Sequence, residues 1–311
     1  MNLPHSARRS ALAACLAAGV ILAAAPRLPA QRESRESRER HVFASVVDKN
    51  SAPVPDLGVA DFTVAEDGIT REIVKVAPAT APMQIALLID NSDVTEPLIP
   101  HLRKAAAGFV QRVLDTSPSS EISLMTFGER PVTETQFTTS SIALLRTSGS
   151  LIWRSGSGAY MIQAVMEASK ALKKHGATRP LIVVFASEEG PEFSDYRHER
   201  VVEALKAAGA TLWTMAYQPP ASRTSVEFAT RPEGRERAEV LSGVSVESGG
   251  ENKLILAQQS IPDVFLNVAT MLTAEYDVTY GRPVMLIPPQ KLAVTVKRPG
   301  VRLWAPRWAE Q

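Results

Sequence analysis

The sequence predicts an α/β protein with a doubly wound, mostly parallel sheet, helices on both of its faces, and a small antiparallel β unit beside it. From Met83 onward, apolar β-rich runs alternate with amphipathic helical segments, which is typical of a parallel sheet covered by helices. Residues 181–186 form a continuous apolar run, as expected of a strand buried on both faces. Residues 42–78 and 276–306 instead show short alternating runs, which predict antiparallel strands that flank the sheet.

The overall composition is that of a globular protein. Of the 311 residues, 45% are hydrophobic and 22% are charged, and the formal net charge is +1. These values argue against a wholly disordered or coiled-coil chain. A net charge near zero gives no general attraction to nucleic acid, and we find no basic patch outside the N-terminus. We therefore expect no nucleic-acid partner.

Residues 1–30 are predicted to be a secretory signal peptide. Arg8 and Arg9 precede an uncharged stretch at residues 11–25, and Ala30 offers a small residue at a plausible cleavage point. A membrane anchor is the alternative, but the apolar run is shorter than the roughly 20 residues that a span needs. We therefore expect an exported protein, periplasmic or extracellular, without a transmembrane span after cleavage.

Two narrower interpretations concern the same segment. Cys15 lies in a sequence like a lipoprotein box, but most of the apolar core follows it, so lipidation is not expected. The Arg8–Arg9 pair also fits a twin-arginine signal, which leaves the export route open. Cleavage would remove three of the 34 basic side chains and the one cysteine, leaving 31 basic against 33 acidic residues. Thiol catalysis and cysteine-ligated metals are then excluded.

The segment before the first strand is predicted to be a charged linker. Residues 31–41 repeat Arg-Glu-Ser and offer almost nothing apolar to bury. The N-terminal β segment follows at residues 42–78. There, residues 62–65 and 69–76 flank Glu66-Asp67-Gly68, and Asp-Gly supplies the positive φ that a tight hairpin turn requires.

The central region contains the elements of the parallel sheet and its helices. Strands are predicted at residues 84–89, 121–127, 132–137 (an edge strand), 181–186 and 211–217. Helices are predicted from about residue 95 to 114, at 160–174 ending at Gly176, at 197–208 ending at Gly209, and at 261–274. Residues 218–234 are rich in Pro, Ser, Thr and Arg and predict a surface insertion. Strands at 276–280, 292–296 and 301–304 close the chain.

The end of the first central strand carries a motif of a known family. Asp90-Asn91-Ser92 follows an apolar strand and resembles the first loop of a von Willebrand factor type A (VWFA) domain, where the metal-ion-dependent adhesion site begins Asp-x-Ser-x-Ser. Over residues 42–305 the chain is similar to the secreted VWFA-related proteins typical of acidobacteria. The shared motifs are Pro53-Val54 with Leu57, the run from Asp61 to Gly68, and Val296-Lys297-Arg298-Pro299-Gly300.

The resemblance implies a domain organisation. A signal peptide (1–30) and a linker (31–41) would precede an N-terminal β segment (42–78), a Rossmann-like VWFA domain (82–275) and a C-terminal β segment (276–306). It also implies a metal site at the carboxyl ends of the strands. The family takes an Asp and two Ser from the first loop, a Thr from the second and an Asp from the third.

The family's ligand set is incomplete in this sequence, so the site is predicted to be degenerate. Asp90 and Ser92 match the first two ligands, but Val94 occupies the position of the third. In the second loop Ala159 stands where the family has Thr, with Ser157 nearby. In the third loop Ser187 takes the place of the Asp carboxylate.

Three neighbouring carboxylates could substitute for the missing ligands. Asp93, Glu188 and Glu189 lie within a residue or two of the lost positions. A hydrated Mg²⁺, or another divalent cation, needs only one or two protein carboxylates, so weak binding through Asp90 and one of these is possible. Alternatively, Asp90 caps the following helix and complements its dipole. We favour the second interpretation.

No catalytic residues are predicted. The second Asp of Asp90-Asn91-Ser92-Asp93 comes one residue too late for a haloacid-dehalogenase-type phosphatase, and Ser157 is not part of a Gly-x-Ser-x-Gly elbow. A phosphate-binding Gly-rich loop does not occur in the sequence, and the histidines lack the paired spacing of a zinc site.

The expected function is therefore that of an exported, non-enzymatic binding module. Its loops at the carboxyl ends of the sheet would contact an unidentified protein partner or a surface. The loop residues expected to take part are Asn91, Trp153, Ser157, Ala159 and Ser187. Two alternatives remain: a structural or assembly protein of the cell envelope that uses the flanking β unit, and a cryptic hydrolase.

Overall fold

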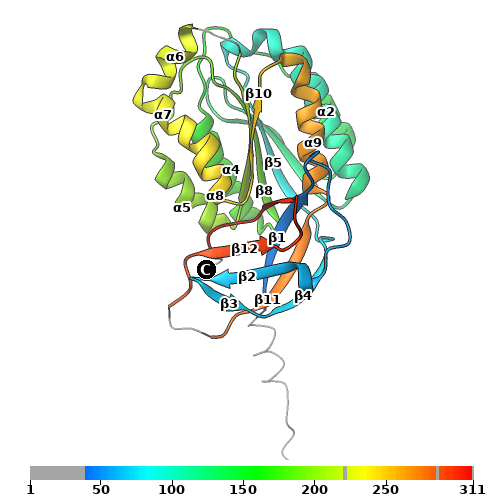
Figure 1. The fold of residues 1–311 in the computed structure, drawn as a ribbon. Coiled ribbons are helices and arrows are strands. Elements are labelled where there is room, and N and C mark those ends of the chain that lie inside the picture. Colours follow the sequence, from blue (N-terminus) through cyan, green and yellow to red (C-terminus); the bar gives the residue numbers. More distant parts are fainter. Residues whose placement is uncertain (1–38, 220–222, 285–286, 310–311) are drawn as a thin grey trace, which may run out of the picture. The chain divides into compact units, whose positions relative to one another are not determined.

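The computed structural model describes residues 39–219, 223–284 and 287–309, so the predicted signal peptide and most of the linker lie outside the described residues. Its centre is a six-stranded sheet in the order β10-β9-β8-β5-β6-β7 (Figure 1). All neighbours pair in parallel except β7, which is antiparallel to β6 at the edge. The strands are β5 (Gln84–Ile89), β6 (Glu121–Thr126), β7 (Val132–Thr138), β8 (Pro180–Ser187), β9 (Thr211–Tyr217) and β10 (Asn252–Ile255).

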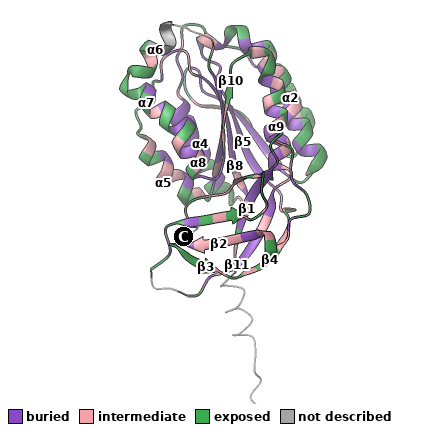
Figure 2. Cartoon of the chain, viewed as in Figure 1, coloured by how far each residue is buried: buried purple, intermediate pink, exposed green. Residues whose placement is uncertain are grey.

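Helices cover both faces of this sheet, which confirms the doubly wound class. One face packs against α2 (Ile99–Thr116), α3 (Ser141–Gly149) and α9 (Ile261–Leu272). The other packs against α4 (Met161–His175) and α5 (His198–Ala208). Strand β5 shows why both layers form: Ile85, Leu87 and Ile89 enter the first core, and Ala86 and Leu88 enter the second. The strand is buried along its whole length (Figure 2).

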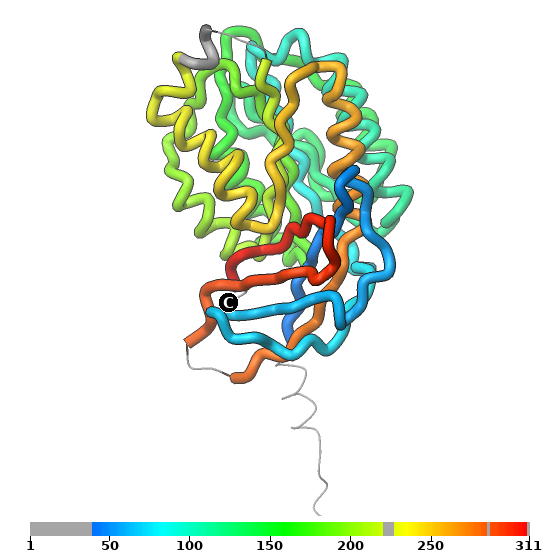
Figure 3. The backbone as a smooth tube through the Cα atoms, in the orientation of Figure 1, coloured from blue at the N-terminus to red at the C-terminus, as the bar shows by residue number. Residues whose placement is uncertain are grey.

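The N- and C-terminal segments pair with each other in two smaller antiparallel sheets, as Figure 3 shows by the blue and red tubes lying side by side. The four-stranded sheet has the order β13-β1-β11-β4, and the three-stranded sheet has the order β12-β2-β3. The strands are β1 (Glu39–Val47), β2 (Phe62–Glu66), β3 (Ile69–Arg71), β4 (Ile73–Pro78), β11 (Tyr276–Gly281), β12 (Leu292–Val296) and β13 (Arg302–Trp304). They enclose a core of their own.

Several boundaries differ from the sequence predictions. Strand β1 begins at Glu39, inside the predicted linker, because residues 39–44 pair with β11. The predicted hairpin forms, with positive φ at Asp67 and Gly68, but its second strand divides after Arg71 into β3 and β4, which belong to different sheets.

The segment predicted to be a surface insertion is largely helical. It contains α6 (Arg223–Thr230) and the start of α7 (Pro232–Glu239), whose proline occupies the favourable first turn. A π-helical turn (Val240–Val244) and the short α8 (Ser245–Glu247) then lead into β10. Helix α3 and strand β10 had no strong sequence signal, and the structure adds them.

A buried ion pair joins the central sheet to the flanking β unit. Arg179, just before β8, donates to Glu275 Oε2 at 2.6 Å and to the Leu272 carbonyl at 2.7 Å. On the β1 side, the Ser45 hydroxyl donates to Glu275 Oε1 at 3.2 Å, and the guanidinium lies 5.0 Å from the centre of the Phe43 ring. Within the described residues, no helix is sufficiently long and apolar to cross a membrane.

Candidate functional site

The candidate site lies at the carboxyl ends of β5 and β8, the two central strands. The chain order reverses between them, because β5 leads to β6 on one side while β8 leads to β9 on the other. In open α/β sheets such a switch point leaves a crevice outside the carboxyl ends of the strands, where ligands usually bind. Three loops meet here: residues 90–93 after β5, residues 150–160 before α4, and residues 188–197 after β8.

Asp90 is fully buried, and both of its carboxylate oxygens accept backbone hydrogen bonds. Oδ1 accepts from the Ser92 amide at 2.9 Å, and Oδ2 accepts from the Ser187 amide at 3.0 Å. Burial raises the pKa of Asp90, while hydrogen bonds from Ser92 and Ser187 and the charge of Arg237 act in the opposite direction. Asp90 thus connects the ends of β5 and β8 instead of bonding amides in the first turn of the next helix.

Asn91 and Asp93 attach the second loop to the first. The Asn91 side chain donates to the Ile152 carbonyl at 3.0 Å and accepts from the Gly128 amide at 2.7 Å, and its carbonyl accepts from the Arg154 amide at 2.7 Å. Asp93 Oδ1 accepts from the Gly156 amide at 3.0 Å. The loop that carries Trp153 is therefore fixed by several hydrogen bonds.

The second and third loops are also connected to each other. The Ala159 amide donates to the Pro191 carbonyl at 2.9 Å, and the Phe193 amide donates to the Ala159 carbonyl at 2.8 Å. Both backbone polar groups of Ala159 therefore lie in a short parallel bridge between the loops. Its buried methyl group has no oxygen to offer to a metal.

Glu192 and Ser194 cap helix α4 from the third loop. Glu192 Oε2 accepts from the Met161 amide at 3.3 Å, and Ser194 Oγ accepts from the Gln163 amide at 3.0 Å. The residue at the helix's own N-cap position, Tyr160, supplies no side-chain cap. Burial raises the pKa of Glu192 to about 6, although Ser194, Arg237 and the Met161 amide favour its charged form.

Arg237, on α7, is a site residue that the sequence interpretation missed. Its side chain is 3% exposed, and its Nη2 donates to the carbonyls of Glu188 at 3.0 Å and Gly190 at 3.2 Å. Its Nη1 is buried and has no hydrogen-bond partner among the described residues. Burial raises the pKa of Glu188, and the positive charge of Arg237 lowers it again.

The predicted site residues differ in how deeply they are buried. Asp90, Ser92 and Ser187 are buried around the Asp90 carboxylate, and the Ser187 hydroxyl accepts from the Glu189 amide at 3.2 Å. Asn91 and Ala159 are also buried, whereas Ser157, Glu188 and Glu189 are half-buried, and Asp93 and Trp153 are exposed.

The residues present do not form a good oxygen cage for a divalent cation. Mg²⁺ requires near-ideal octahedral coordination, and Ca²⁺ requires six to eight oxygens. Both oxygens of Asp90 are already directed at protein amides, and Val94 and Ala159 provide no side-chain oxygen. Val94 also packs on Gly190, since a Cβ built on this glycine would lie 3.1 Å from Val94 Cγ1. The buried guanidinium of Arg237, which donates to two carbonyls of the third loop, further disfavours a bound cation.

Large apolar side chains are exposed on these loops. Ile152 and Trp153 of the second loop are 49% and 38% exposed, and Phe193 and Tyr196 of the third are 51% and 40% exposed. Phe193 lies over Gly158, where a Cβ would approach its ring to 2.5 Å, and its ring centre is 5.8 Å from that of Tyr160. We call Ile152, Trp153, Phe193 and Tyr196 the exposed loop patch.

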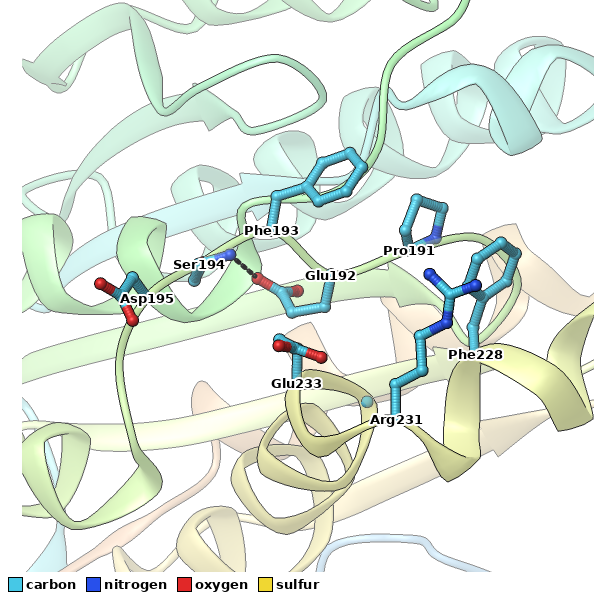
Figure 4. A pocket seen from close by; sticks show the side chains of 9 residues that line it. Pro191, Glu192, Phe193, Ser194, Asp195, Phe228, Arg231 and Glu233 are labelled. Atoms are coloured by element: carbon cyan, nitrogen blue, oxygen red, sulfur yellow. Dashed lines mark hydrogen bonds between the residues drawn. The ribbon is translucent and has the colours of Figure 1, made fainter.

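A cavity of about 260 Å³ lies beside the third loop (Figure 4). Residues 191–195 line one side, and Phe228, Arg231, Glu233 and Gly234 line the other. Arg231 lies over the Phe228 ring, 4.9 Å from its centre, and forms an ion pair with Glu227. The cavity shares Glu192 with the cap of α4.

His198, Glu199 and Glu236 are close enough together to hold a metal ion. However, Glu236 Oε2 already makes two hydrogen bonds with His198, accepting from the backbone amide at 2.8 Å and pairing with the ring Nδ1 at 2.7 Å. The hydrogen bond to Glu236 raises the pKa of His198, and Glu199 is exposed. This geometry is that of an ion pair joining the start of α5 to α7.

Comparisons with known proteins find similarity in the central part of the chain. Residues 85–189 match the family model of the von Willebrand factor type A domain, so this part of the chain is similar to domains of that type. Domains of this type commonly act as non-enzymatic modules for protein–protein interaction or adhesion. A search of the curated proteins finds no match.

Three of the solved structures that are similar to this chain are of bacterial proteins. The von Willebrand factor domain of the type V pili tip protein Mfa5 from Porphyromonas gingivalis is 12% identical, with a TM-score of 0.46, covering 62% of this chain and 96% of that one. A von Willebrand factor type A protein from Catenulispora acidiphila is 11% identical, with a TM-score of 0.48, covering 88% and 75%. The conserved hypothetical protein BatB from Bacteroides thetaiotaomicron is 15% identical, with a TM-score of 0.42, covering 62% and 100%.

Proposed function

We propose that this protein is an exported, non-enzymatic binding module that holds a protein partner or a surface through the loops at the carboxyl ends of its central sheet. The observation that carries this proposal is the exposed loop patch, whose four apolar side chains lie on loops that meet beside Asp90. The proposal includes periplasmic or extracellular location, and membership of the secreted acidobacterial-type VWFA-related group with a degenerate metal site.

The physical argument rests on exposure combined with rigidity. Exposed aromatic side chains on a prepared surface are typical of interface anchors, because burying them against a partner removes much apolar area from water. Here the supporting loops are already fixed by the Asn91, Asp93 and Ala159 hydrogen bonds, so little ordering entropy is lost on binding.

A paired substitution tests the proposal. Trp153→Ala combined with Phe193→Ala should weaken binding to the partner or surface at least tenfold, because truncating each interface anchor typically costs about 1–2 kcal/mol or more. The measurement is quantitative capture of envelope extracts by immobilised full-length protein, followed by titration of the enriched partner. The double variant should keep the wild-type circular dichroism spectrum and melting temperature, since the Trp153 and Phe193 side chains are exposed.

Ile69→Ser with Val74→Ser provides the matched control, because Ile69 and Val74 are also exposed, at 56% and 52%, but lie on the flanking β unit. This control also tests the alternative function in envelope structure or assembly. Strands β3 and β4 are edge strands, and edges with exposed apolar residues can pair with another chain. If the control pair loses the partner while the loop pair retains it, the alternative function replaces the loop proposal.

A further inference from the structure

Arg237 reaches the candidate site from an unexpected part of the chain. It lies on α7, in the segment between β9 and β10, yet its Nη2 donates to two carbonyls, Glu188 and Gly190, of the loop that follows β8. That loop begins directly after Ser187, where the family resemblance places the Asp ligand of the third loop. Gly190 adopts φ +77, a left-handed conformation that favours glycine, and Val94 packs against it. One of the two carbonyls that bind the guanidinium therefore belongs to a residue whose backbone conformation few other residues adopt.

The charges around Arg237 are those that a cation would otherwise compensate. Its charge interacts electrostatically with three carboxyl groups, Asp90, Glu188 and Glu192, which are buried or half-buried. An arginine is always charged in proteins, and a buried charge is costly unless opposite charges or dipoles compensate it. The arginine and the carboxyl groups therefore stabilise each other.

We propose that the guanidinium of Arg237 takes the place of the divalent cation at this site, so that the loops are held by a fixed positive charge of the chain itself and the module works without metal. The buried, unpartnered Nη1 and the two carbonyl hydrogen bonds of Nη2 place this charge on the metal loop. The absence of side-chain oxygens at Val94 and Ala159 is consistent with a guanidinium in place of the cation, because a guanidinium does not require octahedral oxygen coordination.

The substitution has a testable consequence for metal binding. The neutral variant Arg237→Gln removes the fixed charge and leaves the Asp90, Glu188 and Glu192 carboxyl groups without it. Carboxyl groups without a nearby counter-charge attract cations, so the variant should gain a metal response that the wild-type protein lacks. Arg237→Lys keeps a positive charge but loses the planar fork, so it should be intermediate in stability.

Thermal unfolding and calorimetric titration of the full chain provide the test, with EDTA compared against 10 mM Mg²⁺, Mn²⁺ or Ca²⁺. We expect the melting temperature of the wild type to be the same in all four conditions, with no saturable heat of binding. Arg237→Gln should melt roughly 10 °C lower in EDTA, and Mn²⁺ or Ca²⁺ should restore about 3 °C. Arg235→Gln, an exposed arginine of the same helix, is the matched control and should behave as the wild type.

Two results would overturn the proposal. One is saturable binding of Mg²⁺, Mn²⁺ or Ca²⁺ by the wild-type protein that Asp90→Asn abolishes. The other is an Arg237→Gln variant as stable as Arg235→Gln and unresponsive to metal. If Arg237→Gln does not fold, two measurements still test the proposal: the melting temperature of Arg237→Lys relative to the wild type, and the calorimetric titration of the wild type with metal. Metal binding by the wild type would contradict the proposal. None of these measurements uses a partner, so they are independent of the proposed function.

Discussion

At the scale of single residues, Glu192 combines deep burial with a structural hydrogen bond. Its side chain is 4% exposed, and its carboxyl oxygens accept from the amides of Met161 and Ser194. Burial raises its pKa from the ordinary 4.5 to about 6, so the group binds a proton within a mildly acidic range. Acceptor oxygens remain available in the neutral form, so we expect the cap of α4 to persist when Glu192 is protonated.

The raised pKa predicts a pH dependence of stability. The folded protein binds the Glu192 proton more tightly than the unfolded chain does, so this contribution is present below pH 4.5 and is lost as pH rises through about 6. The free energy of unfolding should therefore fall by on the order of 2 kcal/mol over this range from Glu192 alone. Urea titrations between pH 4 and pH 8 should show this fall in the wild type and a smaller one in Glu192→Gln.

Asp90 and Glu188 also have raised pKa values and contribute slopes of the same sign, so the difference between the two proteins is the quantity that reports on Glu192. Glu203→Gln, at an exposed position on α5, is the matched control. Parallel wild-type and Glu192→Gln curves would contradict the assignment.

At the scale of elements, two helices receive their amino-terminal caps from other segments. Helix α4 is capped by Glu192 and Ser194, and the first amide of α5 donates to Glu236 on α7. Neither helix has a side-chain cap at its own N-cap residue. The loops at the site and α7 are thereby tied to the helices that they adjoin, and the caps contribute to tertiary as well as local stability.

Ser194→Ala measures this coupling. Loss of the hydroxyl removes the acceptor for the Gln163 amide, so the free energy of unfolding should fall by about 1 kcal/mol. Ser242→Ala, which removes an exposed hydroxyl that bonds only a carbonyl of its own helix, should change it by less than about 0.5 kcal/mol. Chemical denaturation monitored by circular dichroism distinguishes the two values, and equal effects would argue against a remote cap.

At the scale of the whole described molecule, the central sheet and the flanking β unit share buried polar and aromatic contacts. The Arg179–Glu275 ion pair lies where β8, α9, β11 and β1 come together. Near the C-terminus, Trp304 of β13 lies 6.4 Å, ring centre to ring centre, from Trp213 of β9. The Arg307 amide also donates to the Glu247 carbonyl at 2.9 Å. We therefore expect the two parts to unfold in one transition.

Breaking the buried ion pair should destabilise both parts together. Arg179→Met leaves Glu275 buried without its partner and should lower the free energy of unfolding by about 3–5 kcal/mol. The double variant Arg179→Met/Glu275→Gln should recover part of this loss, because the remaining amide is neutral and can still accept from Ser45. Arg200→Met, at an exposed ion pair, should cost less than about 1 kcal/mol. Denaturation followed by tryptophan fluorescence and circular dichroism checks these values, and two separate transitions would contradict a shared unit.

Much of the fold could be predicted from apolar periodicity. The buried run of β5, the apolar face of α2 and the Asp-Gly hairpin were all recognisable, and the structure confirms them. Helix α3 and the four-residue edge strand β10 were not, because short and partly exposed elements lack a clear period. Placement of Asp90, Ser92 and Ser187 at one edge of the sheet followed from the ends of two parallel strands.

The sequence by itself determined the layers of the central sheet and the presence of flanking antiparallel strands, and it placed residues without a side-chain oxygen at Val94 and Ala159. Only the tertiary structure decided that Arg237 enters the site and that Glu192 and Ser194 cap α4. From the sequence, an arginine such as Arg237 in a polar segment is expected to be exposed, because apolar periodicity identifies only those buried faces that are lined by apolar residues. A buried charge is stabilised instead by carbonyls and carboxylates from loops far away in sequence, and the folded chain alone brings these groups together.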